Sequence, residues 1–282
     1  MVLQLDHFHL ALSIHAYTPR NNQLCGINEY GQGTYTAEGI TAIANALRVN
    51  GSLTKLSLAK NELKEEGTKA ICKALKQNTT LKELDISGRW GVSNIGGPAG
   101  VKHVAKMLGV NGSLTALDLS FNYLKDKGVS AVCEAIQSNK ETKLSSLNFG
   151  DNGIGPVGAN AVAAMVAATG SLTSLSLAKN ELGDDGAEAL LIGLKENKSL
   201  TTLDLSGRGF GEGCIGPRGA KALASAISVN GSLTSIDLSS NQLCGLNWEG
   251  KGNYTTVGIT AIADALRANG SLTKMRYVSP QT

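Results

Sequence analysis

One phrase recurs from the first quarter of the chain to its C-terminus: three leucines at fixed spacing and then an asparagine, first as Leu53-x-x-Leu56-x-Leu58-x-x-Asn61. The copies start at Leu53, Leu81, Leu114, Leu144, Leu172, Leu200, Leu233 and, in part, Leu272. Successive starts lie 28, 33, 30, 28, 28, 33 and 39 residues apart. This period predicts an array in which each unit is one strand followed by one helix. Arrays of this kind carry their function on an extended surface, which argues against an enzyme.

The unit Leu53–Thr80 shows how each copy is expected to fold. Side chains alternate along a strand, so Leu56 and Leu58 should point inward and Ser57 outward. Asn61 follows where the chain must turn, and its side chain can bond backbone groups that would otherwise be buried unpaired. The apolar residues in the second half of the unit recur at helical spacing. One unit cannot bury its own apolar face, so stacked units should share a continuous core.

The phrase and its full helix resemble the ribonuclease-inhibitor type of leucine-rich repeat. That type is also found in the repeat domains of NOD-like receptors and in Ran GTPase-activating proteins. The match runs from about Asn22 to Tyr277. The resemblance implies an α/β leucine-rich-repeat solenoid, a horseshoe with a parallel sheet on its concave side and α-helices on its convex side. It does not fix the function, because this architecture serves many partners.

The chain also repeats at longer intervals. A shift of 119 residues, the length of four repeats, lays Leu53 on Leu172 and Leu114 on Leu233. A shift of 219 residues lays residues 22–55 on residues 241–274, with 25 of 34 positions identical. The residues from Asn22 onward are therefore the second half of a repeat.

These matches predict how the array begins and ends. The strand of the first repeat should lie near residues 14–20 and carries a proline, which suits an edge, so residues 1–21 are expected to be a degraded N-terminal capping strand. Residues 22–282 are then the leucine-rich repeats, one continuous solenoid that ends in a lone strand beginning at Leu272. An open edge there predicts either end-to-end self-association through the C-terminal strand or continuation into further sequence.

Composition narrows the class of protein. The 282 residues carry 26 basic and 23 acidic side chains, interleaved along the chain, for a net charge of +3. No basic stripe for nucleic acid and no apolar run of membrane-spanning length occurs. The N-terminus is a poor signal peptide, and five scattered cysteines suggest no disulfide framework. These features predict a cytoplasmic protein without a bound cofactor.

Seven Asn-x-Ser/Thr triplets recur, and all but one lie just before a strand: Asn50, Asn78, Asn111, Asn197, Asn230, Asn253 and Asn269. The same triplets are ordinary turn chemistry and are also acceptors for N-glycosylation. Both interpretations stay open at this point.

Four Gly-rich segments follow strands and are expected to form loops along one rim of the array: residues 26–36, 88–97, 207–216 and 245–256. They hold six of the twelve aromatic residues of the chain: Tyr30, Tyr35, Trp90, Phe210, Trp248 and Tyr254. Aromatic side chains in surface loops make binding hot spots. The alternative is that the loops fold back and bury these rings against the rim.

Charged residues mark a second candidate surface. The outward strand positions between the leucines hold Asp85, Asp118, Asp204 and Asp237. They form an acidic stripe that receives a basic segment of a partner. Alternatively, aspartate is simply the usual residue at this position of the repeat and keeps the face soluble. Arg89 and Arg208 replace the asparagine of the phrase in two repeats, where they contact a partner or anchor the inserted loops.

No constellation for catalysis or metal binding is present in the sequence: the histidines, cysteines and glycines lack the required spacings. The leading hypothesis is a non-catalytic scaffold that binds a protein partner through the concave sheet and the aromatic rim loops. The alternatives are a GTPase-activating regulatory module, which the resemblance to the Ran activators suggests, and the ligand-sensing repeat fragment of an immune receptor.

Overall fold

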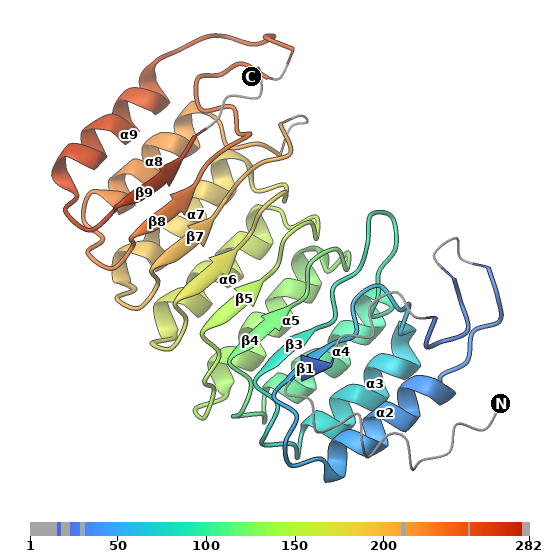
Figure 1. The fold of residues 1–282 in the computed structure, drawn as a ribbon. Helices are drawn as coiled ribbons and strands as arrows, with labels where there is room; N and C mark the ends of the chain where they lie inside the picture. Colours follow the sequence, from blue (N-terminus) through green and yellow to red (C-terminus); the bar gives the residue numbers. More distant parts are fainter. Residues whose placement is uncertain (1–15, 18–22, 29–31, 210–212, 248, 278–282) are drawn as a thin grey trace. The chain divides into compact units, whose positions relative to one another are not determined.

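The computed structural model describes residues 16–17, 23–28, 32–209, 213–247 and 249–277 (Figure 1). They divide into two compact units. Unit 1 holds the described residues up to Asn122 together with Ser138–Leu144, and unit 2 holds Tyr123–Gln137 and the described residues from Ser145 onward.

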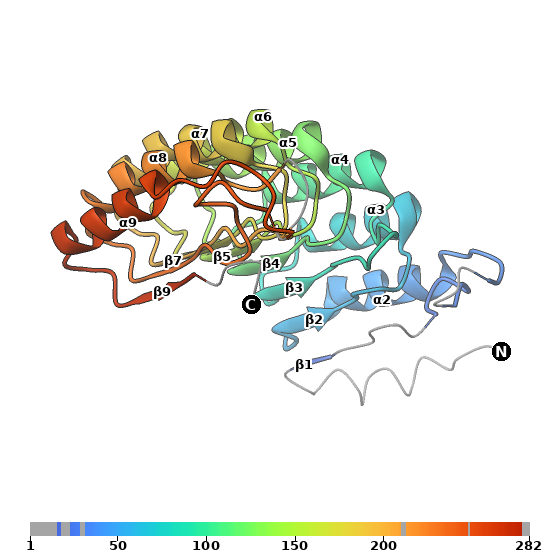
Figure 2. The same cartoon turned by 90° about the horizontal axis from the view of Figure 1, so that it is seen from above.

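Unit 1 is a stack of parallel strands with helices on one side (Figure 2). Its strands are β1 (Ala16–Tyr17), β2 (Lys55–Ser57), β3 (Glu83–Asp85) and β4 (Ala116–Asp118). Its helices are α2 (Glu38–Val49), α3 (Lys64–Leu75) and α4 (Gly97–Leu108). Each strand pairs with the next in sequence, and Leu56, Leu84 and Leu117 lie side by side in register.

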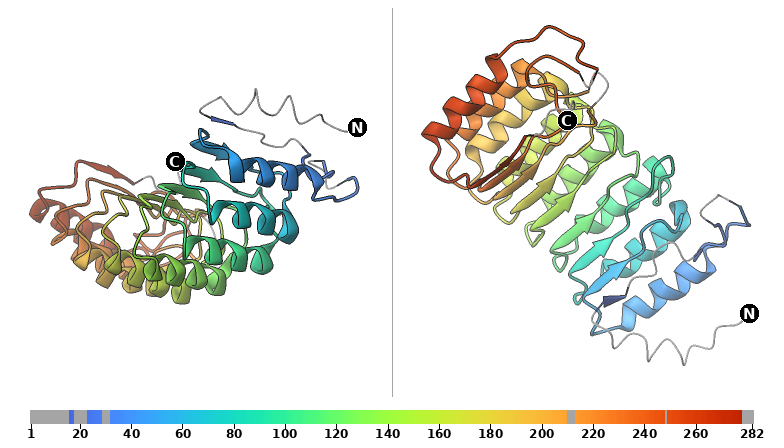
Figure 3. Two further views of the ribbon diagram at one scale, coloured as in Figure 1. Left: turned by 90° about the horizontal axis from the view of Figure 1, so that it is seen from below. Right: turned by 45° about the horizontal axis from the view of Figure 1, so that its top comes forward.

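Unit 2 repeats this arrangement (Figure 3). Its strands are β5 (Ser146–Asn148), β6 (Ser174–Ser176), β7 (Thr202–Asp204), β8 (Ser235–Asp237) and β9 (Lys274–Arg276), again all parallel and in sequence order. Its helices are α5 (Lys125–Ser138), of which only the last residue falls in unit 1, and α6 (Pro156–Ala168), α7 (Gly183–Glu196), α8 (Pro217–Ile227) and α9 (Val257–Ala268). The chain is an α/β leucine-rich-repeat solenoid, as its sequence predicts.

The core lies between the strands and the helices of each unit. Leu56 and Leu58 are buried, and so are the matching leucines of the later repeats. Phe149 takes the position of Leu58 in its own repeat and is the largest of the fully buried side chains. Ser57 stands at the outward position between these leucines, yet only 5% of its surface is exposed, and its hydroxyl donates to Oδ2 of Asp85 at 2.7 Å.

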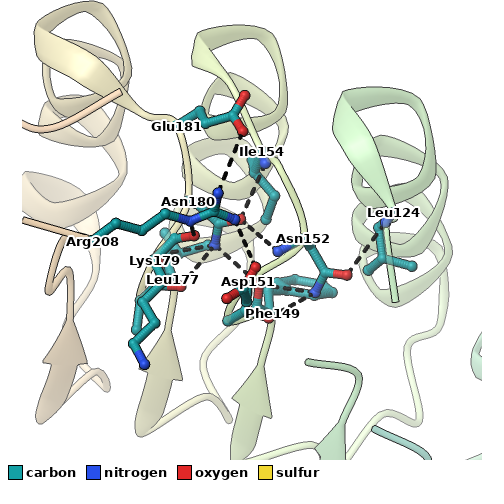
Figure 4. Close-up of polar contacts among 12 residues, drawn as sticks. Leu124, Phe149, Asp151, Asn152, Ile154, Leu177, Lys179, Asn180, Glu181 and Arg208 are labelled. Atoms are coloured by element: carbon teal, nitrogen blue, oxygen red, sulfur yellow. Dashed lines mark hydrogen bonds and ion pairs between the residues drawn. The ribbon is translucent and has the colours of Figure 1, made fainter. Parts of the chain in front are cut away.

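A first set of asparagines closes the turn after six of the strands, β2 to β6 and β8, and we call these the strand-end asparagines. They are Asn61, Asn94 and Asn122 in unit 1 and Asn152, Asn180 and Asn241 in unit 2, and all are buried. In unit 2, Asn180 Nδ2 donates to the carbonyls of Phe149 and Leu177, while its Oδ1 accepts the N–H groups of Asn152 and Ile154 (Figure 4). One side chain therefore satisfies backbone groups of two repeats, as the sequence predicts.

A second set lies just before the strands, and we call these the strand-start asparagines. They are Asn78, Asn111 and Asn139 in unit 1 and Asn197, Asn230 and Asn269 in unit 2. In each, Nδ2 donates to a carbonyl near the end of the helix one repeat earlier, as from Asn230 to Leu194 of α7 at 2.6 Å. Five of the six are glycosylation triplets. Because the amide nitrogen is engaged in the fold, these triplets serve as turn chemistry in the folded chain, whereas Asn253 is exposed.

The two ends of the array follow the sequence in part. Ala16 and Tyr17 form a strand that pairs with β2, inside the range predicted for the N-terminal strand. The remainder of the predicted cap, 1–15 and 18–21, lies outside the described residues. At the other end, β9 pairs with β8 as predicted. Among the helices of the described residues, none is long and apolar enough to cross a membrane.

The cysteines give a first test of the packing. Burial raises the pKa of the Cys72 thiol from its ordinary value of 9.0 to about 12 and also raises the pKa of Cys133. We expect both thiols to resist a thiol reagent at pH 8 until the chain unfolds, whereas Cys244, which is half-buried, reacts in the folded chain. Rapid labelling of Cys72 in the folded chain, followed by mass spectrometry, would contradict this packing.

The same shift has a consequence for stability. The folded state favours the protonated Cys72 thiol. The stability that this protonated thiol contributes is therefore fully present below pH 9 and is lost as the pH rises toward 12. The free energy of unfolding is therefore expected to fall above pH 9, and to fall less in a Cys72→Ala variant.

Candidate partner-binding surface

The inserted segment 88–97 of unit 1 forms a tight turn just after β3. Arg89 and Val92 face each other in an antiparallel bridge, and Gly91 between them has a φ of 80°, which favours glycine. Trp90 occupies the tip of this turn with 72% of its surface exposed. The ring therefore does not fold back against the rim, and the turn presents it to solvent.

The base of this turn is fixed to the neighbouring strand ends. The N–H of Gly88 donates to the carbonyl of Ser120 at 2.8 Å, and a side chain at Gly88 would run into the carbonyl of Phe121. Arg89 reaches back to Glu62 of the preceding repeat at 2.7 Å. Trp90 is thus an exposed aromatic residue on a well-anchored turn, so little conformational entropy is lost when a partner covers it.

In the matching segment 207–216 of unit 2, the arginine, Arg208, has different partners. Arg208 donates through Nη2 to Asp151 at 2.6 Å, and through Nε to the carbonyl of Lys179 at 3.0 Å (Figure 4). Glu181, which corresponds to Glu62 under the shift of 119 residues, lies 4.0 Å from Arg208 Nη1. Both arginines are therefore tied to acidic residues of preceding repeats. Phe210 lies outside the described residues, as do Tyr30 and Trp248.

The structure corrects where the sequence interpretation placed the asparagine in the repeats with inserted segments. In unit 1, Asn94 takes the buried role that the sequence assigned to the position of Arg89: its Nδ2 donates to the carbonyls of Leu58 and Ile86. The insertion displaces the asparagine of the phrase along the chain instead of removing it. In unit 2, the equivalent position is Gly213, which cannot supply an amide side chain.

The first and last of the four inserted segments have the same backbone form. Ile27 bridges Gly33 in one, and Leu246 bridges Gly252 in the other. Their tyrosines differ. The hydroxyl of Tyr35 donates to the carbonyl of Leu63 at 2.7 Å, whereas Tyr254 is 67% exposed.

The four aspartates share one geometry at the strand ends. In each, Oδ1 accepts the N–H of the serine two residues on, as from Ser120 to Asp118 at 2.8 Å. Oδ2 of Asp85 also accepts the hydroxyl of Ser57 from the preceding strand, and Oδ2 of Asp204 accepts that of Ser176 at 3.3 Å. Each aspartate therefore closes the turn after its strand, a role that the sequence interpretation missed.

Strand register brings the aspartates together in pairs within each unit. Asp85 is the partner of Asp118 in unit 1, and Asp204 is the partner of Asp237 in unit 2. Arg276 on β9 comes within 3.6 Å of Asp237 and partly offsets the second pair. Neighbouring strands lie roughly 4.8 Å apart, so each pair places two carboxyl groups where one lysine or arginine can approach both.

One further polar cluster, in unit 2, has internal partners. An open hollow of about 510 Å³ in unit 2 is lined by Asp184, Asp185 and Arg218 among others. Asp184 Oδ1 accepts the N–H groups of Gly216 and Gly219 at the start of α8, and Arg218 pairs with Asp185. Within the described part of the chain, no group of three or more histidine, cysteine or acidic side chains is arranged to hold a metal ion.

Comparisons with known proteins identify the repeats. A family model described as "Leucine Rich repeat" matches residues 49–72, 110–133, 140–163 and 171–191. The chain is 36% identical over 116 residues to "NACHT, LRR and PYD domains-containing protein 9" of Bos taurus, which is 40% of this chain and 11% of that protein. It is 34% identical over 137 residues to the ribonuclease inhibitor of Mus musculus, which is 49% of this chain and 29% of the inhibitor.

A solved structure supports the fold. The leucine-rich repeat-containing protein LegL7 from Legionella pneumophila superimposes with a TM-score of 0.52 at 19% identity, over 94% of this chain and 83% of that one. Together these likenesses support a leucine-rich repeat protein of the ribonuclease-inhibitor type. The aligned part of the chain spans less than a third of either curated relative. Repeats and relatives together indicate a protein-interaction repeat domain.

Proposed function

We propose that this chain is a non-catalytic scaffold that binds a protein partner through the outward face of its sheet and the rim at the strand ends. The observation that carries the proposal is Trp90, an exposed tryptophan at the tip of an anchored turn. Tryptophan is enriched among residues that dominate binding energy, and pre-organised turns lower the entropy cost of binding.

The charge on the sheet supports a basic partner segment. The pairs Asp85–Asp118 and Asp204–Asp237 offer carboxylates on neighbouring strands, next to the strand ends that carry the rim loops. Complementary charge of this kind raises association rates and selects partners more than it adds affinity. Each unit has its own proposed binding surface: the Asp85–Asp118 pair and Trp90 in unit 1, and the Asp204–Asp237 pair and Tyr254 in unit 2. The sequence adds Tyr30 to the first surface, and Phe210 and Trp248 to the second. Tyr35, Arg89 and Arg208 hold the rim in shape.

Affinity capture from cells tests this function. We expect Trp90→Ala to lower retention of a captured protein by about 30-fold, which corresponds to a hot spot of roughly 2 kcal/mol. The matched control is Ile192→Ala on α7, because Ile192 is also apolar and 64% exposed but lies on the helix layer. Equal retention by wild type and Trp90→Ala, with both variants folded, would remove this turn from the binding surface.

A ribonuclease is a second candidate partner, favoured by the 34% identity to the ribonuclease inhibitor and by the aspartate pairs. We expect the chain to slow RNA hydrolysis by a basic ribonuclease, and Asp85→Asn with Asp118→Asn to weaken that effect. Unchanged RNA hydrolysis in the presence of excess chain would reject a ribonuclease as the partner.

The immune-receptor fragment is supported by the likeness to the NACHT, LRR and PYD protein. The proposed compartment is the cytoplasm, supported by cysteines that form no disulfide.

A further inference from the structure

Two nearly identical segments occupy different surroundings in the fold. Residues 22–55 and 241–274 are identical at 25 of 34 positions. Their backbones agree in detail: Thr36 N–H donates to the Cys25 carbonyl at 2.9 Å, and Thr255 N–H donates to the Cys244 carbonyl at 2.9 Å. Differences in exposure between the segments therefore reflect what packs against them, not how they fold.

The first segment is covered by the repeat that follows it. Tyr35 donates its hydroxyl to the Leu63 carbonyl, accepts the Gly67 N–H at 3.3 Å and holds Lys64 Nζ 4.7 Å from the centre of its ring. A side chain at Gly67 would come within 2.9 Å of Ile40, so the glycine lets α3 approach α2 closely. The carbonyl of Leu47 accepts Asn78 Nδ2 at 2.9 Å.

The second segment presents the same side chains to solvent. Leu47 is 1% exposed, whereas its counterpart Leu266 is 38% exposed. Four further pairs follow the same order, from more buried to more exposed: Ile40 and Ile259, Ala44 and Ala263, Cys25 and Cys244, and Tyr35 and Tyr254. Leu24 and Leu243 show the reverse order, because the second segment also has a repeat before it. Identical residues are thus uncovered at the C-terminal face of unit 2, formed by α9 and the loop that bears Tyr254.

We propose that this face is a docking site for one further leucine-rich repeat whose chemistry is that of Leu56–Thr80. The repeat must bring a lysine at the start of its helix to lie over Tyr254 and a backbone carbonyl to accept its hydroxyl. It must also carry a glycine three residues after that lysine, to let its helix approach Ile259, and an asparagine to donate to the Leu266 carbonyl. The docking face shares Tyr254 with the proposed partner-binding surface but contains neither aspartate pair. Its occupant is a repeat and not a basic segment, so this proposal goes beyond the partner-binding function.

The test supplies this face with the same repeat that already covers the matching segment, residues 22–55, in unit 1. In an extended chain, residues 275–282 are replaced by a second copy of residues 56–80, which keeps the natural junction after lysine. We expect the melting temperature to rise by about 5 °C or more, because the added repeat covers apolar surface that is now exposed. An extended chain that melts at or below the temperature of the original overturns the proposal.

Two substitutions separate specific docking from general stabilisation. Leu266→Asp and Tyr254→Phe are expected to change the melting temperature of the original chain little, and each to remove at least half of the gain in the extended chain. The matched control is Tyr35→Phe, which is expected to lower the melting temperature of both chains, because Tyr35 already contacts its repeat. Equal effects of Tyr254→Phe in the two chains contradict the proposed contact.

Light scattering of the original chain identifies a competing occupant. We expect a monomer at all concentrations, with the face free to take a repeat. A dimer that Leu266→Asp dissociates would show that a second copy of the chain occupies the face, which overturns the proposed occupant.

Discussion

Replacing Asn122 by alanine is expected to lower the free energy of unfolding by roughly 3–5 kcal/mol, one of the two largest effects in the chain. Asn122 is fully buried, and its Nδ2 donates to the carbonyls of Ile86, Leu119 and Ser120. Its Oδ1 accepts the N–H of Asn94 at 2.9 Å and that of Ile95 at 3.1 Å. Alanine would leave the N–H groups of Asn94 and Ile95 without their acceptor in the interior, where an unpaired polar group costs about 1–3 kcal/mol. The carbonyls of Ile86 and Ser120 keep Asn94 Nδ2 and the Gly88 N–H as donors.

Denaturation by urea, followed by circular dichroism, measures this loss. The control is Asn45→Ala, in the same unit but exposed on α2, and its effect is expected to stay within about 0.5 kcal/mol. If Asn122→Ala were no more destabilising than Asn45→Ala, the asparagine would not hold the turn as described.

Phe149→Ala is expected to cost roughly 3–5 kcal/mol, because it removes the largest fully buried side chain and leaves a cavity between strand and helix layers. Phe149→Leu is the matched control, since the equivalent position in several other repeats holds leucine and the replacement stays apolar. That change is expected to cost less than about 1.5 kcal/mol. The same urea titration separates the two variants, and similar losses for both would mean that the site tolerates no change of shape.

The regular part of the fold follows from local patterns, which is why the sequence predicts it well. Alternation along the strand places Leu56 and Leu58, and helical spacing places the buried face of α3, without knowledge of distant contacts. The same holds for β9, whose pairing with β8 follows from the register of one repeat on the next. Stacking then fixes the order of the strands in each unit.

The candidate surface depends on neighbours, and there the sequence was insufficient. Tyr35 and Tyr254 lie in nearly identical segments, yet one packs on the next repeat and the other is exposed. Asn94 could be found only by asking which amide lies within reach of the Leu58 carbonyl after an insertion. The spacing between each aspartate and the serine two residues on was visible in the sequence and signals the turn closure that was missed.

The central claim is that a partner covers the sheet face and the strand-end rim and leaves the helix layer free. Hydrogen–deuterium exchange of the chain, alone and with its captured partner, tests this claim most directly. We expect slower exchange in residues 83–92 and 116–120 of unit 1, which contain Asp85, Trp90 and Asp118, and unchanged exchange at the exposed start of α6 around Val157. Protection confined to the helices, with residues 83–92 unaffected, would contradict the account.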